Sequence, residues 1–130
     1  MGFDLYGISP SGKDNPKGIL MDEKGGYFRN SVWNWRPLWD LVCNTSMDIL
    51  TPEDCLRGTY NDFHTIDKSK ALRIAARLDK HLKSGFIKKY IEDRDKELSN
   101  DGVNSGYELV VENVERFAEF CKFSGGFKIG

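Results

Sequence analysis

Hydrophobic and polar residues alternate at both ends of the chain. Phe3 and Leu5 are separated by small or polar residues, and this two-residue period predicts a short strand over residues 3–6. The apolar segment 127–129 is long enough only for a strand, and we expect it to pair antiparallel with the first. The stretch 9–26 is polar and punctuated by Gly and Pro, which predicts a long polar loop or hairpin excursion.

The densest apolar segment spans Tyr27 to Cys43. Pro37 has no backbone N–H to donate to the carbonyl of Trp33, which argues against a helix capped at residues 30–31. We therefore expect the helix to open near Trp35, with the proline in its first turn. Its buried stripe then consists of positions at the i, i+3, i+4 spacing: Leu38, Leu41 and Val42.

Capping signals predict two more helices in the middle of the chain. The run Thr51-Pro52-Glu53-Asp54 begins a short helix that ends at Gly58, because it combines a capping hydroxyl, a proline and two acids. Asp67 can cap a longer helix with apolar residues at helical spacing. Gly85 either ends that helix in the left-handed conformation or sits as a kink, and a helical pattern then continues to Asn100.

A last helix is expected from about Val111 to Phe123, and the stretch 59–65, which has no periodicity, is expected to be a loop. The pattern predicts a mainly α (α+β) fold: a single compact helical domain over residues 1–130 with a small terminal antiparallel β element. The length of 130 residues fits one domain, and eight Phe, five Tyr and three Trp argue against disorder.

The charge balance disfavours a nucleic-acid partner. The chain carries 19 basic and 20 acidic residues, for a net charge of -1, whereas neutralising phosphates usually requires a basic excess. The segment Lys68 to Lys89 is locally basic, with Asp79 as its single acid. A solvated helix face is the favoured interpretation, and nucleic-acid binding through this helix is the third hypothesis for function.

The sequence predicts a cytoplasmic protein without metal or cofactor. No apolar run approaches the roughly 20 residues of a membrane span, and the N-terminus lacks a signal pattern. Three widely spaced cysteines favour a reducing compartment, and no cysteine or histidine has the paired spacing of a zinc site. Cys55 lies near a helix N-terminus that lowers a thiol pKa, but Glu53 and Asp54 oppose that effect.

Residues 7–13 spell G-x-x-x-x-G-K directly after a predicted strand. In a phosphate-binding loop, such glycines let backbone N–H groups surround phosphates, and the lysine reaches the outer ones. Asp14 stands where Ser or Thr is required, and Pro16 opposes the helix that should follow. We therefore favour a turn-rich loop without this function.

The run Asn61-Asp62-Phe63-His64 is the most distinctive polar cluster. Asp62 and His64 flank Phe63 and can point the same way in an extended loop, as an orienting carboxylate and a general base would. No nucleophile is placed beside them by the sequence. A loop held by side-chain to backbone hydrogen bonds is favoured, and a small hydrolase-like or transferase-like enzyme using His64 and Asp62 is the alternative.

The aromatic segment interleaves arginine and asparagine with tryptophan. Guanidinium groups over indoles can hold an anionic or planar ligand, and aromatic residues with arginine dominate interface hot spots. Burial of most of the segment in the core is the favoured structural interpretation. The leading hypothesis is a non-catalytic binding module that holds a protein or small anionic ligand, with these candidate residues: Arg29, Asn30, Trp33, Trp35, Arg36, Asn61, Asp62 and His64.

Three strings, GFDLYG at the start, YFRNSVWNWRPLW in the centre and FAEFCKFSGGF near the end, resemble a family of short bacterial and phage proteins. The resemblance covers both ends and the aromatic centre, about half of the chain. It implies a bacterial or phage origin, a shared fold and, if phage-encoded, location in the host cytoplasm. It transfers no catalytic residue, because no activity is assigned to the family. The stretch 9–26 is longer than the family pattern.

Overall fold

The computed structural model describes residues 2–15, 19–100 and 107–130. These residues form an α+β domain with a four-stranded antiparallel sheet and five α-helices. The strands are short and the helices follow between or after them, in this order: β1 (Gly2–Gly7), the 3-10 helix η1 (Pro10–Gly12), β2 (Tyr27–Ser31), α1 (Val32–Thr45), α2 (Pro52–Arg57), β3 (His64–Ile66), α3 (Lys68–Ser84), α4 (Phe86–Asn100), α5 (Val111–Phe123) and β4 (Phe127–Ile129).

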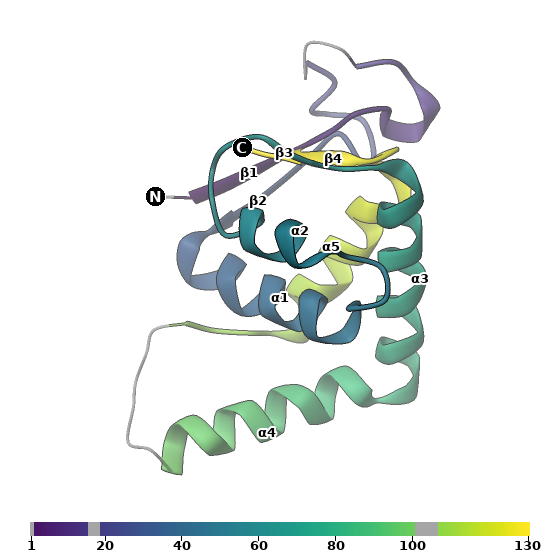
Figure 1. The fold of residues 1–130 in the computed structure, drawn as a ribbon. Coiled ribbons are helices and arrows are strands. Elements are labelled where there is room, and N and C mark those ends of the chain that lie inside the picture. The colour runs from purple at the N-terminus through teal and green to yellow at the C-terminus, as the bar shows by residue number, and fades with distance from the viewer. Residues whose placement is uncertain (1, 16–18, 101–106) are drawn as a thin grey trace.

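The two ends of the chain meet in the middle of the sheet, whose strand order is β2-β1-β4-β3. Leu5 lies opposite both Phe28 of β2 and Ile129 of β4. The predicted pairing of residues 3–6 with 127–129 is therefore confirmed. The five helices lie on one side of this sheet (Figure 1). The prediction of a loop or hairpin over 9–26 falls partly outside the described residues, because 16–18 are not described.

One hydrophobic core lies between the sheet and the helices. Strand residues alternate inward and outward, so that Phe28 is buried while Arg29 faces solvent. Phe117 of α5 stands at the centre, with its ring 5.4 Å from that of Phe28 and 5.6 Å from that of Trp35. Edge-to-face aromatic pairs of this kind add to the free energy gained from burial.

Helix α1 begins three residues before the predicted start near Trp35, so that prediction was wrong. Ser31 caps it by accepting the N–H of Asn34 at 3.4 Å, and Pro37 lies inside the helix. The proline leaves the Trp33 carbonyl without its usual helical donor. The N–H of Glu108 donates to that carbonyl at 3.2 Å, so the carbonyl is not left without a hydrogen bond, as the sequence alone had suggested.

The expectation of a loop over 59–65 was wrong at its end, since β3 begins at His64. This strand pairs with β4, so that Ile66 lies opposite Phe127. Three residues are too few for an alternating pattern to stand out, and the strand depends on the edge that β4 offers. Asp67 caps α3, as predicted. Of the two alternatives for Gly85, the structure shows the helix end in the left-handed conformation, with φ 83°. Among the described residues, no helix is long and apolar enough to cross a membrane.

Candidate functional site

A buried carboxylate, that of Asp54, joins α2 to β3 and α3. The Thr51 hydroxyl accepts the N–H of Asp54, and Asp54 Oδ2 accepts the N–H of Thr51, both at 3.0 Å. This reciprocal pair is a capping box, and it fixes the first turn of α2. The same carboxylate also contacts His64 Nε2 at 2.8 Å through Oδ1 and Lys70 Nζ at 2.6 Å through Oδ2.

The partners of Asp54 keep its carboxylate charged. Burial disfavours the charged form, but the hydrogen bonds from Lys70, from the Thr51 N–H and from His64 outweigh it. Together they lower the pKa of Asp54 to about 2. A carboxylate that accepts several hydrogen bonds and lies beside a cation remains ionised in this way. Asp54 is thus an anchor that holds three elements together.

The loop after α2 is fixed by separate contacts. Arg57 Nε donates to Asp62 Oδ2 at 2.9 Å, and Asn61 Nδ2 donates to the Gly2 carbonyl at 3.0 Å. The Phe63 N–H donates at 2.8 Å to the carbonyl of Ile129, the residue of β4 that also lies opposite His64, and this bond ties the end of the loop to the sheet. These contacts hold residues 61–63 as a fixed loop, which is the interpretation that the sequence favoured.

The predicted pairing of Asp62 with His64 is not what the structure shows. Asp62 turns to Arg57, and the carboxylate that His64 contacts is Asp54. Sequence reasoning identified Asp54 only as an acid in the first turn of a helix and did not single out Lys70. The capping signature of residues 51–54 indicated where the carboxylate would be held, but nothing in the spacing indicated its two distant partners.

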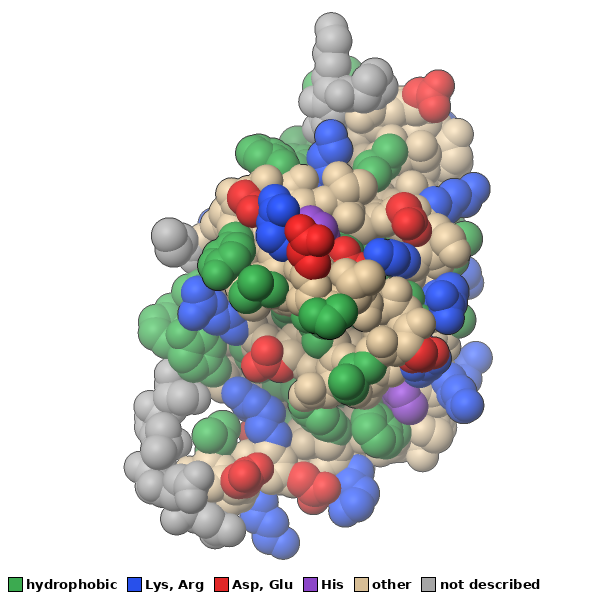
Figure 2. Space-filling model, viewed as in Figure 1, with side chains coloured by type: hydrophobic (Ala, Val, Ile, Leu, Met, Phe, Trp, Pro, Cys, Tyr) green, Lys and Arg blue, Asp and Glu red, His purple; other side chains and the backbone are tan. Residues whose placement is uncertain are grey.

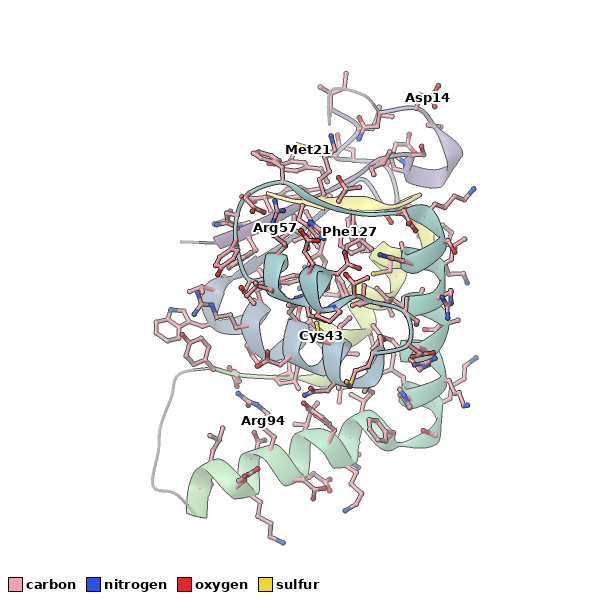
Figure 3. All side chains as sticks on the ribbon, in the orientation of Figure 1. Asp14, Met21, Cys43, Arg57, Arg94 and Phe127 are labelled. Atoms are coloured by element: carbon pink, nitrogen blue, oxygen red, sulfur yellow. The ribbon has the colours of Figure 1, made fainter. Side chains whose placement is uncertain are left out.

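Large apolar side chains are exposed on the segment from Leu56 to Phe63. Leu56, Tyr60 and Phe63 are 56%, 51% and 63% exposed. We call residues 56–64 the α2–β3 corner. Figure 2 shows acidic, basic and histidine side chains gathered over α2 and β3, with hydrophobic side chains beside them. Arg57, labelled in Figure 3, is the last residue of α2 and lies at the end of this helix that is near the sheet.

Two residues of the predicted binding surface are inside the protein. Trp35 is fully buried, and its indole Nε1 donates to the Gly58 carbonyl at 2.8 Å. Asn30 is also buried and exchanges two hydrogen bonds with Asn113, at 3.0 and 2.9 Å. Their polar groups are satisfied by the fold itself, as buried polar groups usually are. Neither side chain is placed to contact a partner.

The other predicted residues of the aromatic segment are on the surface but separated. Arg29 lies on the outer face of the sheet and pairs with Asp4 at 2.8 Å. Trp33 is half exposed, and its ring lies 4.7 Å from that of Tyr107. Arg36 is exposed on α1 and shares no hydrogen bond or ion pair with His64 within the described parts of the chain. The structure therefore does not gather the eight predicted residues into one site.

The three cysteines are buried or partly buried. Cys121 is buried, and burial raises the pKa of its thiol. Cys43 and Cys55 both pack against the core. The pKa of Cys43 is raised, mainly by burial and secondly by its hydrogen bond with the Cys55 thiol. Within residues 2–15, 19–100 and 107–130, no three His, Cys, Asp or Glu side chains are grouped to hold a metal ion.

Comparisons with protein-family models, with curated protein sequences and with solved structures found no match. The resemblance to short bacterial and phage proteins therefore stays a prediction.

Proposed function

We propose that this chain is a non-catalytic binding module that docks a protein partner on the α2–β3 corner. The observation that carries the proposal is the group of three large apolar side chains, Leu56, Tyr60 and Phe63, exposed on one short segment. Scattered apolar residues are normal on a surface, whereas a group of them beside charged residues is typical of interaction sites.

The backbone of the corner is held in place before any partner binds. Leu56 and Tyr60 are four residues apart on a helical turn that continues past α2, because the Thr59 and Tyr60 N–H groups donate to the Leu56 and Arg57 carbonyls at 3.1 Å. The ion pair of Arg57 with Asp62 and the contact of Asp54 with His64 fix the segment from both sides. Binding to a pre-ordered surface loses less conformational entropy.

Phe63 supports the proposal through its backbone. Its φ of 62° lies in the left-handed region, which is unfavourable for a bulky residue. Strained residues of this kind persist where the surrounding structure holds them, and they cluster at functional sites. Here the strained residue is an aromatic ring turned to solvent, with its edge near Gly130. Such a ring is a suitable anchor for a pocket on a partner.

The enzyme alternative has one favourable observation, the 2.8 Å contact between His64 and Asp54. An orienting carboxylate and a base stand in this relation. However, no hydroxyl or thiol of the described residues hydrogen-bonds to His64, and Asp54 also holds Thr51 and Lys70. These contacts favour a structural clamp.

Two basic residues of α3 are already paired with carboxylates, which weakens the case for nucleic-acid binding through this helix. Arg77 forms two 2.8 Å bonds with Asp48, and Lys70 is committed to Asp54. Side chains that are already neutralised release little further free energy on contact with phosphates.

The proposal is tested by placing the photo-crosslinker benzoylphenylalanine at position 63 and irradiating the chain in an extract of the organism that encodes it. The captured protein is then purified and its affinity measured by calorimetry. Phe63→Ala and Tyr60→Ala are expected to cost about 1–3 kcal/mol of binding free energy each, as interface anchors do.

Phe86→Ala is the matched control, because Phe86 is an aromatic residue exposed to 42% on α4, away from the corner. It should leave the affinity unchanged. Equal losses for Phe63→Ala and Phe86→Ala, with all variants folded by circular dichroism, would show that the corner is not the docking surface.

A further inference from the structure

A cavity of about 340 Å³ opens where η1, the start of α3 and the end of α5 come together. Figure 1 shows η1, the short turn that follows β1, next to the start of α3, at the end of the sheet where β1 and β3 finish and β4 begins. The volume of the cavity lies at the lower end of the range for small-molecule sites, roughly 300–1,000 Å³. It is separate from the α2–β3 corner.

The cavity is positively charged. Lys68 at the start of α3 and Lys122 near the end of α5 both line it, and no acidic side chain of the described residues does. Neither lysine forms an ion pair with the part of the chain that the structure describes; Lys122 instead lies 5.6 Å from the centre of the Phe123 ring. Two lysines that line one cavity, neither of them held in a described ion pair, attract an anion.

Close approach of three segments creates this arrangement, and glycine permits it. A Cβ on Gly125 would lie 2.7 Å from the side chain of Ser9, and a Cβ on Gly126 would lie 2.9 Å from the N atom of Lys68. Both glycines also have positive φ, 68° and 94°. The end of α5 can therefore lie against η1 and α3 only because these positions lack side chains.

Ser9 also lines the cavity and is a polar residue, while Leu72 and Phe123 line it with apolar side chains. Gly12, also on the wall, faces open space, since a Cβ there would meet nothing within 4 Å. A cavity with both polar and apolar walls suits a small molecule that carries an anionic group on a less polar body.

The arrangement differs from a phosphate-binding loop, although it includes part of the G-x-x-x-x-G-K motif. The motif lysine, Lys13, is paired with Glu23 at 2.7 Å. The first turn of α3 is already capped, since Asp67 accepts the Lys70 N–H at 2.8 Å. The positive charge thus comes from two lysines that the motif does not contain.

We infer that this cavity binds the phosphate group of a phosphorylated small molecule. Lys68 and Lys122 provide the charge that faces the phosphate oxygens, the Ser9 hydroxyl donates a hydrogen bond, and Leu72 and Phe123 contact the rest of the ligand. Lysine binds phosphate as a point charge, without the fixed geometry of arginine.

The test is a titration of the isotope-labelled chain with inorganic pyrophosphate, followed by amide NMR at constant ionic strength. Saturable shifts are expected at Ser9, Gly12 and Gly125. Lys68→Gln and Lys122→Gln should each raise the dissociation constant by about three- to tenfold, because each removes one charge that faces the anion.

Lys13→Gln is the matched control, since it removes the same charge from the motif lysine that Glu23 already holds. It should change the dissociation constant by less than about twofold. The inference fails if no saturable shift appears, if the shifts lie elsewhere, or if Lys13→Gln weakens binding as much as the other two variants. None of these results bears on the α2–β3 corner.

Discussion

Two carboxylates in this protein have similar partners but lie in different surroundings. Asp54 contacts Lys70 and His64 with its side chain 7% exposed, whereas Asp4 contacts Arg29 and the Tyr27 hydroxyl with its side chain 27% exposed. Their cationic partners differ as well, since Lys70 is 28% exposed and Arg29 54%. The same kind of ion pair therefore holds separate elements together where it is buried, and contributes little to stability where it is exposed on a sheet.

The difference also appears in what each carboxylate connects. Asp4 and Arg29 lie directly opposite each other on β1 and β2, two strands that the backbone already pairs. Asp54 connects α2, β3 and α3, and the described hydrogen bonds of its carboxylate include one to the start of its own helix. Loss of Asp54 therefore removes contacts that no neighbouring pairing replaces.

The largest expected effect is that of Asp54→Ala. This change removes the Asp54 half of the capping box, so that the Thr51 N–H loses its acceptor, and it leaves Lys70 and His64 without their carboxylate. We therefore expect the free energy of unfolding to fall by about 2–4 kcal/mol. Asp4→Ala should lower it by about 1 kcal/mol or less. Urea unfolding followed by circular dichroism measures both, and equal losses would show that burial does not separate the two sites.

The second prediction concerns pH. The pKa of Asp54 is about 2 in the folded chain against an ordinary value of 3.8, so the unfolded chain binds a proton first as the pH falls. The contribution of Asp54 is complete above about pH 5 and is lost as the pH falls through 4 towards 2, and it amounts to about 2 kcal/mol.

Asp54→Asn isolates that contribution from those of other carboxylates, such as Asp48, whose pKa is also lowered to about 2. The stability difference between the unchanged chain and the variant should shrink as the pH is lowered from 6 to about 2.5. A difference that stays constant over this range would contradict the assigned pKa.

The sequence predicted the features of the fold that have local causes. The capping run at Thr51 and the cap at Asp67 were predicted correctly, because each depends on residues a few positions away. The left-handed end at Gly85 was one of two alternatives that the sequence left open. The strand pairing of the two termini also followed from short alternating patterns.

Features that depend on distant partners were missed. The start of α1 depends on Glu108, whose N–H donates to the carbonyl that Pro37 leaves free. The roles of Asp54 and Lys70 depend on how α2 and α3 pack around β3. The predicted binding surface was divided for the same reason, since Asn30 finds its partner in Asn113 on α5. Spacing along the chain carries no signal for such contacts.

The smallest expected effect is that of Arg29→Ala. Its ion pair with Asp4 is exposed, and Asp4 keeps the Tyr27 hydroxyl as a partner, so the loss of stability at low salt should be smaller than that caused by Asp4→Ala. Raising the salt concentration from about 0.01 M to about 1 M shortens the screening length from about 30 Å to about 3 Å and should reduce that loss further.

Lys70→Ala is the matched variant, because it removes the cation of the buried carboxylate. We expect it to cost more than Arg29→Ala and to keep most of its effect at high salt, since a buried pair is screened much less. Urea, being uncharged, is the suitable denaturant for both salt series. If the two variants lose the same stability and respond equally to salt, the contrast between the buried anchor and the exposed pair is wrong.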